Sequence, residues 1–306
     1  MQRLTVGGTI PGLEGASAYT LQTGSDEALP VLLAVPHDGQ AYPEALLANM
    51  RAPAGSSMRL EDRYVGLIAD RIAAETDLSL LKAHAPRAMI DLNRSVEDID
   101  WGMVTGAKVV AKHHSRATFR ARNGLGLVPR RISGIGELWR RPIPHAEIAQ
   151  RIEQIHAPYH RALWTELERL RDLHGIALLL DLHSMPPLKP TQPGQAAAEF
   201  VLGDRYGASC DSGLSDLALR YIGGKGRRVA HNRPYSGGFM LDRYGQPRRG
   251  IHALQLEVCR SLYLDARLDQ PSAKLPVIAR LVAGLVRCLG EQVRAMAPGR
   301  FAQAAE

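Results

Sequence analysis

Cysteine and aromatic residues are scarce in this chain. Its 306 residues include 3 cysteines, and only 5% of the residues are aromatic. Cys210, Cys259 and Cys288 are far apart and form no C-x-x-C pair, which argues against a zinc site built from thiolates. Few and separated cysteines are typical of reduced thiols, so we expect a cytoplasmic protein.

Long apolar segments are missing as well. The N-terminal residues, MQRLT, have no apolar stretch typical of a secretory signal. The chain also has no run of about 18 apolar residues, which is the length that a membrane-spanning helix requires. We therefore expect no membrane partner.

Positive charge is present but scattered, with a net charge of +7. The densest basic cluster, residues 116–141, also contains several glycines, and we expect residues 101–141 to form a mobile Gly/Arg-rich insertion. This loop lacks the interleaved aromatic residues of a single-strand nucleic-acid binder. Attraction of a small anionic substrate is the favoured interpretation, with no nucleic-acid partner. A non-enzymatic anion or nucleic-acid binder that uses this loop is the lower-ranked alternative.

Segments with strand and helix patterns alternate along most of the chain. This alternation predicts a single α/β domain over residues 1–306, with a central mixed, largely parallel sheet flanked by helices. Pro158 predicts a break near His156 in the expected helix at residues 145–174. The expected strands are residues 30–36, 78–82, 88–92, 175–183, 199–203 and 253–258, and the expected helices are residues 61–76, 145–174, 211–222 and 275–296.

Polar side chains follow several of the expected strands. The apolar run that begins at Gly175 ends abruptly in Asp181, His183 and Ser184, and His37 and Asp38 follow residues 30–36. Asn93 and Arg94 follow residues 88–92, and Glu257 lies in the strand at residues 253–258. Parallel strands bring their carboxyl ends to one edge of a sheet, where ligands bind.

These residue types together suit metal-dependent hydrolysis. Each also has a structural explanation: the Asp38-Gly39 pair is a turn signal, Asn93 could cap the next segment, and Glu257 could be an ion-paired group. As a set, they supply histidines for a metal, a carboxylate for proton transfer and an arginine for an anionic substrate. Zinc in a catalytic site takes three protein ligands and keeps one position for water.

Five segments carry a resemblance to a known family. They are VPHDGQAYP at residues 35–43, DLNR at 91–94, DLHSM at 181–185, HNRPYSGG at 231–238 and QLEVCRSLY at 255–263. In these motifs and their order, the chain resembles the N-formylglutamate amidohydrolase family. The family is similar to zinc carboxypeptidases and aspartoacylases, so the resemblance implies a zinc-carboxypeptidase-like fold. It also implies hydrolysis of a small acidic N-acyl amino acid, such as N-formyl-L-glutamate to formate and glutamate, in histidine degradation.

The resemblance also implies roles for individual residues. His37 and His183 match metal ligands, and the acidic ligand between them matches Asp62, with Glu61 as the competing assignment. The implied cofactor is Zn²⁺ or another divalent metal. Glu257 matches the general base of carboxypeptidase-like sites.

Further residues match substrate-binding positions. Asn93 and Arg94 resemble the pair that holds a substrate carboxylate. Arg87, six residues before Asn93, is a weaker candidate for a second anion contact or a carbonyl polariser. Asn232 and Tyr235 lie in a family motif, although Tyr235 could equally be a packing residue. A carboxypeptidase-like reaction, or cleavage of another N-acyl amino acid or peptide, is the alternative activity.

Three residues carry weaker signals. Asp38 departs from the family pattern, where a serine is frequent after the histidine. Ser184 invites a serine nucleophile, but no G-x-S-x-G elbow surrounds it. We expect Cys259 to be a buried structural thiol.

Overall fold

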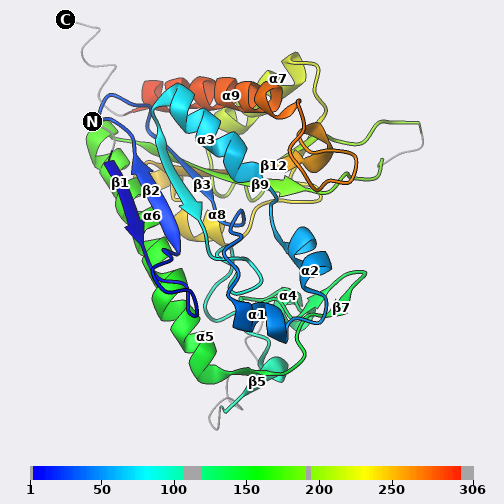
Figure 1. The fold of residues 1–306 in the computed structure, drawn as a ribbon. Coiled ribbons are helices and arrows are strands. Elements are labelled where there is room, and N and C mark those ends of the chain that lie inside the picture. The colour runs from blue at the N-terminus through cyan, green and yellow to red at the C-terminus, as the bar shows by residue number, and fades with distance from the viewer. Residues whose placement is uncertain (1–2, 107–118, 191–193, 298–306) are drawn as a thin grey trace, which may run out of the picture.

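A mixed sheet of eight strands forms the centre of the molecule (Figure 1). The computed structural model describes residues 3–106, 119–190 and 194–297. The strand order is β1-β2-β4-β3-β9-β12-β10-β11. These strands are β1 (Arg3–Gly7), β2 (Tyr19–Thr23), β3 (Val31–Val35), β4 (Ser79–Ala83), β9 (Ala177–Met185), β10 (Phe200–Gly203), β11 (Val229–His231) and β12 (Ile251–Cys259).

The four central strands, β4, β3, β9 and β12, run parallel to one another. Towards the two edges, β2 pairs antiparallel with β4, and β10 pairs antiparallel with β12. Every residue of β3, β9 and β12 is buried, as expected for parallel strands covered on both faces. The predicted α/β class and mixed, centrally parallel sheet are confirmed.

Helices α3 (Val65–Thr76), α7 (Ser212–Gly224) and α9 (Leu275–Ala295) cover one face of the sheet (Figure 1). Leu178, Leu180 and Leu182 of β9 point into this layer and are fully buried. The helices present apolar side chains at helical spacing, which bury one stripe of each helix against the strands.

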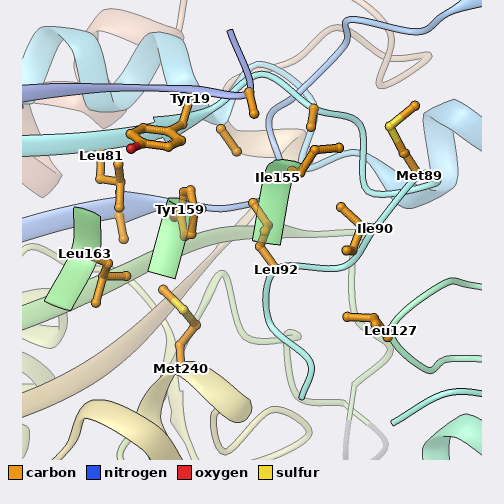
Figure 2. Packing of buried hydrophobic residues seen from close by; sticks show 14 of the residues in the cluster. Tyr19, Leu81, Met89, Ile90, Leu92, Leu127, Ile155, Tyr159, Leu163 and Met240 are labelled. Atoms are coloured by element: carbon orange, nitrogen blue, oxygen red, sulfur yellow. The ribbon is translucent and has the colours of Figure 1, made fainter. Parts of the chain in front are cut away.

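Helices α6 (Ala157–His174) and α8 (Phe239–Tyr244) contact the other face. Figure 2 shows this second core, in which Tyr159 and Leu163 of α6 lie near Leu81 of β4 and Met240 of α8. The remaining helices are α1 (Glu44–Asn49), α2 (Pro53–Leu60), α4 (Phe119–Arg122) and α5 (His145–Arg151), with single turns at Trp101–Met103, Pro247–Arg249 and Arg260–Leu262.

The long helical pattern at residues 145–174 is interrupted near His156, as Pro158 predicts. A π-helical segment, Ile152–His156, separates α5 from α6. Pro158 has no N–H to donate to the carbonyl of Gln154, and its ring crowds that carbonyl. The Gln154 carbonyl instead accepts a hydrogen bond of 3.0 Å from the Thr9 backbone N–H.

Two of the sequence-based element assignments need correction. Residues 88–92 form turns and not a strand: the Met89 and Arg94 N–H groups bind the carbonyls of Pro86 and Asp91. Their apolar side chains are buried in the core of the second face, so the hydrophobic run reflects packing and not strand pairing. The helix expected over residues 61–76 begins at Val65, which leaves Asp62 in the preceding loop.

The described part of the predicted insertion contains short strands and buried side chains. Strand β5 (Val104–Thr105) pairs with β8 (Ile143–Pro144), and β6 (Arg131–Ile132) pairs with β7 (Gly136–Glu137). Trp139 is buried and donates a hydrogen bond of 2.7 Å to the Pro129 carbonyl. Residues 107–118 lie outside the described residues, and the mobility of the insertion and the single-domain organisation stay predictions.

No helix in the described ranges combines the length and the apolar character needed to cross a membrane.

Candidate active site

The polar end of one sheet face forms the floor of the site. Odd-numbered residues of β9 share one face, and along that face Ala177 and Leu179 pack in the core whereas Asp181 and His183 are polar. Glu257 of β12 is in register with His183 on the neighbouring strand. The change from apolar to polar side chains therefore occurs at the carboxyl end of the parallel strands, where an open α/β sheet binds its ligands.

His37 and Asp62 reach the same place from two loops. His37 lies in the turn that follows β3, and Asp62 lies just before α3. The two loops are joined by a hydrogen bond of 2.8 Å from the Asp62 backbone N–H to the His37 carbonyl. Two segments that are distant from β9 in the sequence are thereby placed beside His183.

His37, Asp62 and His183 form a cluster whose potential ligand atoms all lie within 4.8 Å of one another. Asp62 Oδ2 is 2.8 Å from His183 Nδ1 and 3.5 Å from His37 Nδ1. The three residues are nearly inaccessible to solvent, with 2%, 3% and 4% of their surfaces exposed. Glu61, the competing acidic ligand, turns away and pairs with Arg63 at 3.1 Å. The geometry thus places Asp62, and not Glu61, between the histidines.

The second nitrogen of each histidine is held by a carboxylate. His37 Nε2 is 2.7 Å from Asp91 Oδ1, and His183 Nε2 is 2.9 Å from Asp181 Oδ2. Both rings therefore present Nδ1 to the centre of the cluster. His37 Nδ1 is buried and has no hydrogen-bond partner among the described residues. A buried imidazole nitrogen without a partner, backed by a carboxylate on its other nitrogen, fits a metal ligand.

The charges in this cluster shift each other's pKa. Burial alone would raise the pKa of Asp62, but the hydrogen-bonded His183 imidazole, and after it the nearby His37 imidazole, lower it below its usual value. Burial opposes protonation of His183, yet Asp181 and Asp62 together raise its pKa well above its usual value. Asp62 is therefore held in its ionised form, and a carboxylate between two imidazoles suits a divalent cation.

The Glu257 carboxylate has a raised pKa, whereas that of Asp62 is lowered. Burial, followed by repulsion from Asp62 and Asp181, raises the pKa of Glu257 to about 7, although His183 and Arg87 act to lower it. Gln255 Nε2 donates a hydrogen bond of 3.0 Å to its Oε1 atom. A carboxylate with a pKa near neutrality can both accept and return a proton, which is the property of a general acid/base.

A cavity of about 420 Å³ opens over these residues. His37, Asp62, His183 and Glu257 line it, and so do Arg87, Asn93, Arg94 and Tyr235. The structure therefore brings together all but one of the sequence-predicted site residues. Four arginines contribute to the wall, Arg59, Arg87, Arg94 and Arg260. Such a concentration of guanidinium groups favours an anionic ligand.

Asn232 is the residue that is not brought to the cavity. Its side-chain amide donates to Asp204 Oδ1 at 2.7 Å and accepts from the Asp204 backbone N–H at 3.0 Å. Its backbone has a positive φ of 59°, a conformation that asparagine tolerates better than most residues. The structure therefore favours a structural role for Asn232 in shaping the loop that carries Tyr235.

Asn93 and the two neighbouring arginines are partly engaged within the protein. Asn93 Nδ2 lies 3.2 Å from Asp181 Oδ2, and its Oδ1 accepts a hydrogen bond of 2.9 Å from the Met240 backbone N–H. Arg87 Nε donates to Asp91 at 2.9 Å. Arg94 donates to the carbonyls of Leu125 and Asn93, both at 2.9 Å. These contacts fix where the guanidinium groups stand in the cavity wall.

The sequence interpretation missed functional roles for Asp91 and Arg260. Arg260 is buried and joins the end of β12 to the loop that carries Asp62: its Nε donates to Ser184 Oγ at 3.0 Å, and its NH groups donate to the carbonyls of Met58 and Glu61. Ser184 is thus a hydrogen-bond partner of Arg260. Both missed residues lie inside motifs that resemble the family, DLNR and QLEVCRSLY, which was the available signal.

A family model matches the part of the chain that holds the sheet and the cavity. Residues 29–264 match the model described as N-formylglutamate amidohydrolase. The chain belongs to this family. The matched range includes His37, Asp62, His183 and Glu257, so the family assignment and the candidate site concern the same part of the molecule.

Named relatives agree with this assignment. The chain is 30% identical to the N-formylglutamate deformylase of Pseudomonas aeruginosa over 278 residues. This alignment covers 90% of this chain and 96% of that protein. The chain is 32% identical over 241 residues to the N-formylglutamate deformylase of Pseudomonas putida, covering 78% and 82% of the two chains. The crystal structure of the N-formylglutamate amidohydrolase from Ralstonia eutropha JMP134 superimposes with a TM-score of 0.81 at 31% identity, over 91% of this chain and 99% of that one.

Proposed function

We propose that this protein hydrolyses N-formyl-L-glutamate to formate and L-glutamate, with a divalent metal, Zn²⁺, held by His37, Asp62 and His183. The observation that carries the proposal is the buried His37–Asp62–His183 cluster beside Glu257 in an arginine-lined cavity. The deformylase names of relatives at 30% and 32% identity support the choice of substrate. A cytoplasmic location and a role in histidine degradation stay predictions.

The residues present fit a catalytic zinc ion. Two imidazole nitrogens and one carboxylate oxygen are a ligand set that zinc accepts, with one position left for water. When bound, the metal would polarise the formyl oxygen and make a water molecule more acidic. Asp91 and Asp181 would keep the two imidazole rings in the orientation that exposes Nδ1.

Glu257 would move the proton during the reaction. As water attacks the formyl carbon, the Glu257 carboxylate accepts a proton from it and then returns this proton to the amide nitrogen. The C–N bond breaks, and formate and the amino group of glutamate are released. The elevated pKa of Glu257, about 7, matches this double task, because both protonation states are accessible near neutral pH.

The arginines would bind the acidic substrate. Arg94 would hold a substrate carboxylate, and Arg87 would contact the anion or polarise the acyl oxygen from its fixed position against Asp91. Asn93 would act as a positioning residue, since it joins Asp181 of β9 to the start of α8. Tyr235 would close the wall of the cavity beside Glu257.

The test combines metal analysis with a substrate panel. Protein purified without chelator should contain a divalent metal and release formate from N-formylglutamate, and a chelator should abolish turnover until metal is restored. Undiminished turnover by metal-free protein would contradict the metal. A panel of other N-acyl amino acids, and of peptides that a carboxypeptidase would cleave, checks the substrate. Preference for any of these would contradict the proposed substrate and indicate a related amidase activity.

A further inference from the structure

Arg59 differs from the other arginines of the cavity in exposure and in partners. It lies near the end of α2 and lines the cavity, but its side chain is exposed, whereas Arg94 and Arg260 are buried. Asp62 and Glu257, the carboxylates of the cavity, are buried as well. Arg59 therefore stands at the solvent side of the cavity, and the reacting groups stand at its floor.

Two other arginines of the cavity have fixed tasks within the protein. Arg260 spreads its donors over Ser184, Met58 and Glu61, and Arg87 is paired with Asp91. A guanidinium held in this way contributes charge to the cavity but has fewer donors to offer to a ligand.

Arg59 is anchored without being neutralised. Its NH1 group donates a hydrogen bond of 3.1 Å to the carbonyl of Ser133, in the turn between β6 and β7. Gly134 follows in that turn, with its backbone close to the same guanidinium. No carboxylate lies within 4.0 Å of Arg59 in the described ranges of the chain. The side chain is thus positioned by a neutral carbonyl and keeps its full positive charge beside the cavity.

We infer that Arg59 is the specificity residue that binds the side-chain carboxylate of an acidic N-formyl amino acid. This inference rests on the proposed function and names the part of the substrate that binds at the cavity mouth. A substrate with its formyl group at the floor, near Glu257, and its α-carboxylate at Arg94 extends its side chain towards solvent. A guanidinium without a protein counter-charge at that position can bind a carboxylate in bidentate fashion.

The experiment compares two substrates that differ only in side-chain charge, N-formylglutamate and N-formylglutamine. In Arg59→Gln, kcat/KM for N-formylglutamate should fall about 10- to 100-fold through KM, which is the typical effect of losing one charge-assisted hydrogen-bonded pair. The value for N-formylglutamine should change by less than about threefold, because its neutral amide gains little from the charge. Arg59→Lys should recover part of the loss, since the charge is kept but the planar fork is not.

Arg51→Gln is the matched control. Arg51 also extends to the insertion and donates to a backbone carbonyl, that of Trp139 at 2.9 Å, but it does not line the cavity. This variant should leave the preference between the two substrates unchanged. If Arg59→Gln weakened both substrates equally, or changed neither, Arg59 would be a structural anchor and the inference would be overturned.

A binding measurement separates this inference from the proposed function. In the Glu257→Gln background, calorimetry should show that N-formylglutamate binds about 10- to 100-fold more weakly once Arg59→Gln is added, with little change for N-formylglutamine. Charge-dependent binding without formate release by the wild type would contradict the proposed function and retain Arg59 as an anion site. Formate release by the wild type, with an unaltered substrate preference in Arg59→Gln, would support the proposed function and overturn the role of Arg59.

Discussion

The two faces of the central sheet are equally buried but chemically different. On the face under α3, α7 and α9, β9 presents Leu178, Leu180 and Leu182, all without solvent exposure. On the opposite face, the same strand presents Asp181 and His183 after an apolar start, and these side chains are also almost fully buried. One strand of nine residues thus serves packing on one side and chemistry on the other.

The difference shows how the free-energy cost of burying ionisable groups is offset. Each buried acidic or imidazole side chain at the site has an opposite or hydrogen-bonding partner, as in the Asp91–His37 and Asp181–His183 pairs. On the apolar face, by contrast, stability comes from removing hydrocarbon from water and filling space. Substitutions on the polar face should therefore reduce activity or metal binding, whereas substitutions on the apolar face should reduce stability.

Glu257→Gln should give the largest loss of function. Turnover of N-formylglutamate should fall by about 10²- to 10⁴-fold, because a positioned general base contributes that much to catalysis. Stability and metal content should stay close to those of the wild type, since glutamine fills the same space and can still bond Gln255. Formate release and metal analysis on the same sample check this. Substantial residual turnover would remove Glu257 from its proposed role.

Leu180→Ala should produce the converse result on the apolar face. Removing a fully buried leucine costs about 2–5 kcal/mol in free energy of unfolding, through lost burial and the cavity left behind. The kcat/KM of the protein that remains folded should stay within a few-fold of wild type. Urea unfolding and kinetics at low temperature test both parts. A variant that kept its stability but lost activity would break the division between the two faces.

Asp91→Asn should weaken metal binding without removing a ligand. Loss of a carboxylate that supports a metal-binding histidine typically costs about 10- to 100-fold in metal affinity or activity. Competition with a chelator of known affinity measures the effect directly. Asp70→Asn is the control, because Asp70 pairs with Lys82 on the α3 side of the sheet and is outside the cavity lining. Equal metal affinity in both variants would contradict the supporting role of Asp91.

Asp38 should make the stability of the folded protein depend on pH. Burial raises the pKa of Asp38 from 3.8 to about 7, although the Gly66 backbone N–H and Lys82 act to lower it. Between these values the unfolded chain releases a proton that the folded protein keeps, so the free energy of unfolding falls as pH rises towards 7. Asp38→Asn cannot ionise and keeps an acceptor for the Gly66 N–H, and it should lack this fall.

The expected size of the Asp38 effect is modest. Relative to wild type, Asp38→Asn should gain at most about 2 kcal/mol of stability between about pH 5.5 and pH 8, with no further gain above that range. Urea unfolding of both proteins at the two pH values, without added metal, measures the difference. Parallel pH profiles would show that the folded protein carries Asp38 ionised throughout.

Much of the sheet was predictable because its central strands are continuous apolar runs. The patterns at residues 30–36, 175–183 and 253–258 were confirmed as β3, β9 and β12, and Pro158 marked the interruption before α6. The strand predicted at residues 88–92 was wrong, because a short buried loop and a buried strand have the same apolar composition. Its polar successors still reach the cavity, since the turns of this loop lie against the site.

The candidate site was predictable in residue type more than in detail. Histidines after β3 and within β9 follow from strand-end reasoning and from the family motifs. The partners Asp91 and Arg260 could not be assigned, because a hydrogen bond between residues 54 or more positions apart leaves no local pattern in the sequence. Asn232 shared a motif with Tyr235, yet its side chain binds Asp204 and not the cavity.

The sequence alone indicated the central strands β3, β9 and β12 and the residue types that could perform hydrolysis, since burial pattern and side-chain chemistry are local properties. Tertiary structure decided the choice between two adjacent carboxylates, Glu61 and Asp62. Their spacing from every other residue is nearly identical. The backbone hydrogen bond from Asp62 to His37 and the ion pair of Glu61 with Arg63 place Asp62 between the histidines and turn Glu61 away. Tertiary structure likewise placed Arg59 at the cavity mouth with no carboxylate beside it among the described residues, because ion pairing depends on which side chains meet in space.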